Sequence, residues 1–193
     1  MNRTKLMVAM IAAGLSLAGG AIAQGTSKDS YDMTVKRAQE AYKSDRAACS
    51  AMSGNAKDIC METAKGKEAV AKAEAEAAYK NTPKARESAR VARADATYKV
   101  AKEKCDDLAG NVKDVCVKEA KAMHVKGKAD AKVDRVASDA SMQSADKTAV
   151  ARRDAADDKR DADYKVAIEK CDALAGAPKD TCVRDAKTRF GKT

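Results

Sequence analysis

The stretch CDDLAGNVKDVC, residues 105–116, places two cysteines around a central glycine. Related stretches are CSAMSGNAKDIC, residues 49–60, and CDALAGAPKDTC, residues 171–182. In each stretch the glycine follows the first cysteine at the same offset, and a Lys-Asp pair stands shortly before the second cysteine. Matches at fixed offsets indicate an internal repeat, so we predict an array of three units.

Each unit is predicted to be a helix, a tight turn and a second helix. The glycine follows strongly helical sequence, where a residue in the left-handed conformation ends a helix. The third copy then has a proline, which is favoured at the first position of a helix, and the other copies have an asparagine suited to capping that helix. The predicted turn and cap residues are Gly54, Asn55, Gly110, Asn111, Gly176 and Pro178.

The two cysteines of a unit lie about five residues from the turn, on opposite arms of the hairpin. At about 1.5 Å per residue they reach nearly the same height, whereas one continuous helix would hold them about 16 Å apart, too far for a disulfide. The spacing is not C-x-x-C and offers no closely spaced zinc ligands, which disfavours redox-active or metal-binding thiols. The predicted disulfides are Cys49–Cys60, Cys105–Cys116 and Cys171–Cys182.

The N-terminal residues 1–23 have the features of a cleavable export signal. Arg3 and Lys5 precede a short run of apolar and small residues, and Ala21-Ile22-Ala23 has the small-x-small form of a cleavage site. A membrane anchor would need about 18 or more apolar residues, and glycines and a serine interrupt this run early. We therefore expect a soluble periplasmic chain, cleaved after Ala23 and without a transmembrane anchor.

The mature chain divides at two weak points between the units. Asn81-Thr82-Pro83 is the clearer break, with Thr82 as the predicted N-cap and Pro83 at the first helical position. The second break spans Ser138 to Ser144. The predicted hairpin repeats are residues 24–80, 81–140 and 141–193. If the breaks are reversals, six helices form an elongated antiparallel bundle, and if they are kinks, the array is an extended zigzag.

Composition predicts an all-α fold with a thin core. Alanine supplies most of the 45% hydrophobic residues, so bulky side chains are too few for a thick core. Along the leading arms, apolar residues recur with the two-in-seven spacing of a coiled-coil seam. Packing positions in this seam include Tyr42, Tyr98, Tyr164, Met52, Leu108 and Leu174. We expect the tyrosine rings to lie against the partner arm with their hydroxyls in water.

The sequence lacks the features of an enzyme. His124 is the only histidine, with no partner that the sequence identifies, so we expect a lone surface residue. No glycine-rich phosphate loop, H-E-x-x-H or G-x-S-x-G motif occurs, and no catalytic residue, cofactor or metal site is predicted. The net charge of +9 comes from interleaved signs, and the chain has no Trp and one Phe, which disfavours nucleic-acid binding.

The best copy of the repeat, YKVAKEKCDDLAGNVKDVCVKEAK, resembles a group of exported Ala/Lys-rich repeat proteins of Gram-negative bacteria. Members of this group are often labelled cell envelope biogenesis protein TolA. The resemblance covers the export signal and all three units. TolA itself keeps an N-terminal membrane anchor and a folded C-terminal domain, which this sequence does not match. The resemblance implies a place in the envelope and carries no agreed biochemical activity.

These observations favour a non-enzymatic structural or interaction protein of the cell envelope. Paired helices offer grooves and charged faces to another helix or to an anionic polymer. The expected partners are therefore envelope proteins or anionic envelope polymers. The alternative is a stress-related periplasmic binding protein, either a small helical chaperone or a sequestrant of metals or polyanions. An exposed apolar concavity would favour the chaperone, and one-sided lysine and arginine would favour the polyanion binder.

Overall fold

The computed structural model describes residues 26–139 and 144–192, and these form six α-helices. The predicted export signal and its cleavage site lie outside the described residues. Alanine and lysine, which are strong helix formers, are the most frequent residues of the helical sequence. The helices are α1 (Lys28–Cys49), α2 (Gly54–Lys80), α3 (Pro83–Cys105), α4 (Gly110–Ser138), α5 (Ser144–Cys171) and α6 (Gly176–Phe190).

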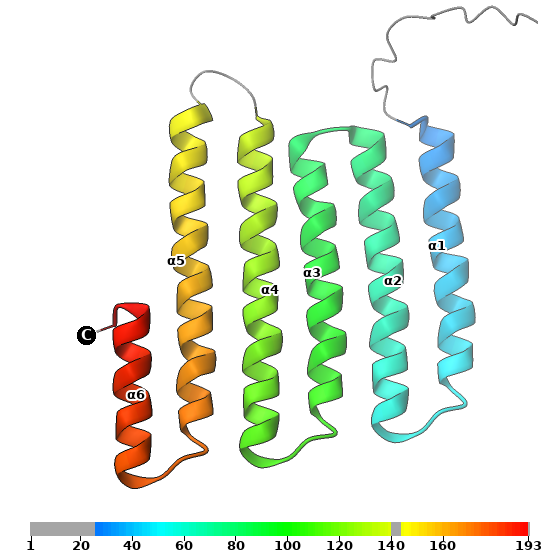
Figure 1. Ribbon diagram of the computed structural model, residues 1–193. Coiled ribbons are helices and arrows are strands. Elements are labelled where there is room, and N and C mark those ends of the chain that lie inside the picture. Colours follow the sequence, from blue (N-terminus) through cyan, green and yellow to red (C-terminus); the bar gives the residue numbers. More distant parts are fainter. Residues whose placement is uncertain (1–25, 140–143, 193) are drawn as a thin grey trace, which may run out of the picture.

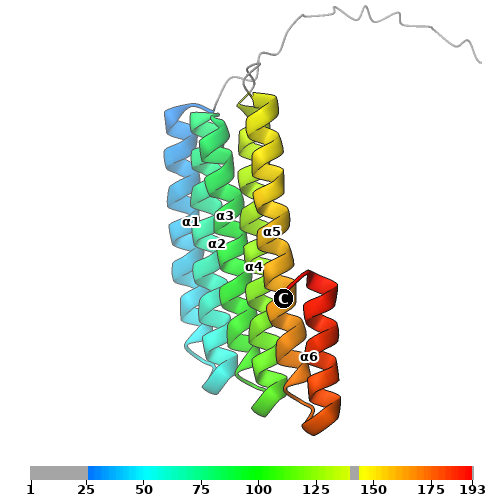
Figure 2. The same ribbon diagram turned by 90° about the vertical axis from the view of Figure 1, so that its left-hand side faces the viewer.

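The helices run antiparallel and lie side by side in chain order (Figure 1). Within the described residues, each helix packs on its neighbours in the chain and on no other helix. The result is a layer one helix thick, seen from its α6 edge in Figure 2. The breaks after α2 and α4 are therefore reversals, which is the first of the two predicted alternatives.

The predicted disulfides are confirmed, and each one links the two helices of a hairpin close to the turn. Their Cα–Cα distances are 5.6, 5.7 and 5.7 Å, and all six cysteines are paired. In each pair the first cysteine is almost completely buried. Such a set of disulfides is typical of a protein that folds in an oxidising compartment outside the cytoplasm.

The predicted thin core is confirmed. The buried apolar residues are alanines and cysteines, and the largest fully buried side chains are Cys49, Cys105 and Cys171. Close backbone contact replaces bulk at Gly66, where an added Cβ atom would lie 2.9 Å from the Cβ atom of Ala96. Small residues therefore allow the helices to approach each other closely.

The turns differ in detail from the prediction. The first helix of each unit ends at its cysteine, before the glycine, and the second helix begins at the glycine itself. Each glycine does adopt the left-handed conformation, with φ of 57°, 56° and 61° at Gly54, Gly110 and Gly176. Pro178 is the third residue of α6 and not the first. A proline at the third position costs the helix little stability, because the first-turn N–H groups of a helix have no intrahelical acceptor.

The predicted capping role of Asn55 and Asn111 is wrong. The N-cap residues of α2 and α4 are Ser53 and Ala109, and neither helix has a side-chain cap at this end. Instead, the Asn55 amide donates to the backbone carbonyl of Glu103 over 2.8 Å. Each asparagine thus reaches the end of the leading helix of the next hairpin. The Glu103 oxygen also accepts from the Asp106 N–H over 3.0 Å, so the amide uses the second lone pair of this carbonyl.

Asn111 makes the corresponding contact at the next joint, donating to the carbonyl of Glu169 over 2.9 Å. The third unit has Ala177 at this position and lacks the donor. The first break follows the prediction more closely, since Thr82 Oγ1 accepts from the Ala85 N–H over 3.1 Å at the start of α3.

Aromatic pairs connect the helices of each hairpin. Tyr98 stacks on His124 of α4 with ring centroids 4.8 Å apart, and Tyr164 meets Phe190 of α6 edge-on at 6.0 Å. These contacts confirm the predicted packing of the two tyrosines against the partner arm. In the first hairpin the pair is Tyr31 with Tyr79, at the end far from the disulfide.

The seam prediction fails at Met52, Leu108 and Leu174, because all three side chains are exposed. They lie in the turns beyond the ends of α1, α3 and α5, where the backbone has already left the helix. A heptad position can face a partner helix only while both helices continue, so the seam stops at the cysteines.

Candidate interaction groove

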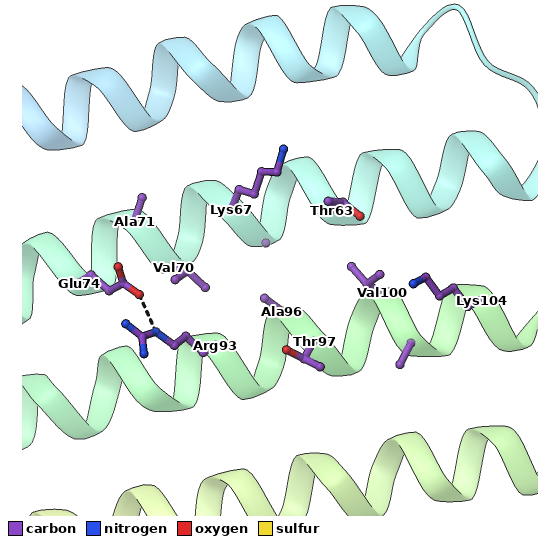
Figure 3. A pocket seen from close by; sticks show the side chains of 12 residues that line it. Thr63, Lys67, Val70, Ala71, Glu74, Arg93, Ala96, Thr97, Val100 and Lys104 are labelled. Carbon is purple, nitrogen blue, oxygen red and sulfur yellow. Dashed lines mark hydrogen bonds and ion pairs between the residues drawn. The ribbon is translucent and has the colours of Figure 1, made fainter.

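A groove lies between α2 and α3, shown in Figure 3. It has a volume of about 710 Å³ and follows the joint between the first and second hairpins. Gly66 and Ala96 contribute to its lining at a close approach of the two helices. Val70 of α2 and Val100 of α3 extend into the space between the helices.

The two ends of the groove differ chemically. At the end far from the hairpin turns, the Arg93 guanidinium donates to the Glu74 carboxylate over 2.6 Å and spans the two helices. At the end near the turns stands Lys104, close to the C-terminus of α3. Lys67 on the rim is directed toward α1, where it pairs with Asp45 over 3.0 Å.

The joint between α4 and α5 has the same place in the repeat and carries ion pairs at positions where the first joint has the groove. Positions are equivalent here when they have the same offset from the cysteines of their units. Lys126 and Asp163 form an ion pair of 2.6 Å across the second joint. Their equivalents in the first joint are Val70 and Thr97, which form no such pair.

A second ion pair is missing in the same way. Lys170 pairs with Glu119 over 2.6 Å across the second joint. Lys104 is the equivalent of Lys170, but it faces Thr63 in place of a carboxylate. Among residues 26–139 and 144–192, Lys104 has no ion pair.

One bridging ion pair is common to both joints. Lys159 pairs with Asp130 across the second joint, and Arg93 with Glu74 across the first. Five ion pairs cross the second joint, and within the described residues the first joint has the equivalent of one of them. Along the groove, two of the missing pairs are replaced by small or apolar side chains and by the ammonium group of Lys104, which has no ion pair. The groove arises from these substitutions and not from a difference in topology.

His124 is not the isolated surface residue that we predicted. Its side chain is half-buried between α3 and α4, stacks on Tyr98 and lies 2.5 Å from the Asp95 carboxylate. Phe190 occupies the equivalent position in the third hairpin, against Tyr164. This equivalence indicates that the imidazole fills a packing position, and its carboxylate partner became apparent only when α3 and α4 were placed together.

No group of three or more His, Cys, Asp or Glu side chains gathers within the described ranges to hold a metal ion. The shifted carboxyl pKa values belong to exposed ion pairs outside the groove. Hydrogen bonds from Lys113 and Lys192 lower the pKa values of Asp106 and Asp161, respectively.

Sequence reasoning found the disulfides and missed the groove. The signal was present in the repeat, because Val70 and Thr97 stand where the next joint has Lys126 and Asp163. Its meaning depends on knowing that these positions face each other across a joint. The offsets alone do not provide that pairing.

No protein family, curated protein or solved structure matches this chain. No helix in the described ranges is both long and apolar enough to cross a lipid bilayer.

Proposed function

We propose that this chain is a non-enzymatic periplasmic protein of the cell envelope with a structural or interaction role, and that the α2–α3 groove is its contact surface. The predicted export signal and the three disulfides support the compartment. The resemblance to exported Ala/Lys-rich repeat proteins supports the envelope assignment.

The observation that carries the interaction role is the larger opening of one joint. The second joint is bridged by ion pairs and holds a cavity of about 210 Å³, whereas the residues at the equivalent positions of the first joint leave an apolar groove of about 710 Å³ beside Val70 and Val100. Exposed apolar grooves are common sites for helix-in-groove recognition. A structural spacer without partners would have no need for two joints that differ in this way.

A small helical chaperone is the second candidate, and a different observation favours it. Met52, Leu108 and Leu174 occupy the same position in the three turns and are all exposed. The three hairpin turns lie at one end of the layer (Figure 1), so this end presents a row of apolar side chains. Such a row would suit unfolded clients of varied sequence.

Photo-crosslinking in intact periplasm tests the proposal. A photoreactive amino acid at Lys67 places the probe on the groove rim, and the matched control is Lys65, an exposed lysine of α2 outside the groove. The closed-groove variant, Val70→Lys with Thr97→Asp, copies the Lys126–Asp163 pair of the second joint.

We expect a small set of envelope components to be captured from Lys67, not from Lys65, and to be lost in the closed-groove variant. A broad set of unfolded proteins captured equally from both positions would favour the chaperone. Equal capture of envelope components by the closed-groove variant would contradict the role of the groove.

A further inference from the structure

We propose that the groove binds an amphipathic helix of a partner protein, oriented by a carboxylate of that helix at Lys104. This inference rests on the proposed function and adds the chemistry of the partner. It follows from three properties of the groove, which are its walls, its length and the placement of its charges.

The walls favour a helix over an extended peptide. An extended strand binds by pairing its backbone with free N–H and C=O groups of a sheet edge. The groove walls are the middle parts of α2 and α3, whose backbone groups are already paired within the helices. The occupant must therefore satisfy its own backbone hydrogen bonds, and an α-helix does so.

The dimensions of the groove fit a short stretch of helix. Its lining on α2 extends from Thr63 to Glu74, which corresponds to about 16 Å or three helical turns. Val70 and Val100 lie near the middle, and small residues such as Gly66 and Ala96 also line the groove. Three turns present apolar side chains at i, i+3 or i+4, and i+7 to this surface.

The charges give the partner helix a direction. Arg93 and Glu74 neutralise each other at one end of the groove, and Lys67 is engaged by Asp45. Lys104 is the cation on the lining that no described carboxylate pairs with. Glu119 pairs with the equivalent lysine of the second joint, which shows that a carboxylate can be accommodated at this position. A carboxylate of the partner would replace that missing group.

An anionic polymer fits these charges less well. Polyanions are held by many cations along a track. The α2–α3 groove offers one unpaired ammonium group beside an apolar floor, so it selects a ligand that is mostly apolar with one anionic group. A fatty acid shares that chemistry and is the competing ligand in the experiment.

The experiment measures fluorescence anisotropy of a labelled model helix of ~18 residues, about five turns, with the disulfide-bonded protein. The peptide carries Leu at i, i+3, i+4 and i+7 and Glu at one end, and its twin carries Gln there. The proteins are the wild type, Lys104→Gln, and the closed-groove variant. Lys102→Gln is the matched control, because this exposed lysine lies on α3 outside the groove.

We expect the wild type and Lys102→Gln to bind the Glu peptide about two- to fivefold more tightly than its Gln twin, the range of an exposed ion pair. Lys104→Gln should bind both peptides equally, and the closed-groove variant should bind both at least about tenfold more weakly than the wild type. An open-joint variant, in which Lys126→Val, Asp163→Thr and Glu119→Thr remove two of the ion pairs across the second joint and copy the residues of the first, should gain a second binding site.

Equal binding of the two peptides by the wild type would contradict the proposed contact between a carboxylate of the partner helix and Lys104. Unchanged binding by the closed-groove variant, or displacement by laurate with no binding of either peptide, would overturn the helical partner. Suppose that the peptide results contradict the helical partner but the closed-groove variant loses its periplasmic crosslinks. The groove is then still the contact surface, and only the proposal of an acidic helix as its partner is wrong. Crosslinks that persist in that variant refute the proposed function itself.

Discussion

Removing the central disulfide tests the physical basis of this fold most directly. Cys105 is fully buried and Cys116 holds the opposite helix, so Cys105→Ser with Cys116→Ser deletes the largest buried group of the hairpin. The Cys105 sulfur lies 3.1 Å from the Ala101 carbonyl oxygen, so a serine hydroxyl at this position can donate to it. The hydroxyl at position 105 is therefore satisfied, and position 116 is partly exposed to solvent. The main loss is the constraint on the unfolded chain.

A ring of about twelve residues restricts the unfolded chain by roughly 3 kcal/mol. For a chain of this length, about 2–4 °C of melting temperature corresponds to each kcal/mol, so we expect a decrease of roughly 6–12 °C. The helical signal at low temperature should remain, because the helices still pack on their neighbours. Circular dichroism melts of oxidised protein measure both quantities.

The matched control is Cys171→Ser with Cys182→Ser. Helix α6 packs on α5 alone within the described chain, so the effect of removing this disulfide should stay within the third hairpin. Hydrogen exchange should then increase in α6 and leave α3 and α4 protected. An unchanged melting temperature in the central variant, or the same exchange pattern in both variants, would refute the view that these disulfides are the core of the array.

Three further predictions concern the joints and the turns. Asn55→Ala should destabilise the protein by about 1 kcal/mol in urea unfolding, because it removes the side-chain hydrogen bond that joins the first hairpin to the Glu103 carbonyl of the second. Gly66→Val should cost about 1–3 kcal/mol in the same assay, since even a Cβ atom would lie 2.9 Å from that of Ala96, and equal stability would contradict the close approach. The hydrogen bond from Lys113 lowers the folded pKa of Asp106 from 3.8, so its contribution to stability is present above pH 3.8 and is lost as the pH falls through the folded pKa. Lys113→Gln should reduce this acid-dependent loss in urea unfolding below pH 3.8, and an unchanged acid dependence would contradict the ion pair.

The repeat also illustrates how one joint can act as a control for another. The first and second joints share their asparagine contact and one bridging ion pair. They differ where Val70 and Thr97 replace Lys126 and Asp163. Substitutions that exchange these residues between the joints therefore test function with side chains that already occur at the equivalent position of the same fold.

The features that the sequence by itself determined are local ones. Each disulfide closes within one unit. In the central unit, the offset from Cys105 to Cys116 and the left-handed Gly110 between them are enough to specify a disulfide-bonded hairpin. The proline at the start of α3, with Thr82 as its cap, likewise acts within a few residues. Local geometry of this kind follows from helical rise and backbone conformation.

Only the tertiary structure decided which residues meet between helices. The amide of Asn55 acts on the next hairpin, His124 packs on Tyr98, and Lys104 is left without a carboxylate. These contacts depend on the relative rotation and height of neighbouring helices. In an alanine-rich chain many such registers bury nearly the same apolar area, so periodicity does not choose among them. The side-by-side packing of six helices selects one register, and with it the groove.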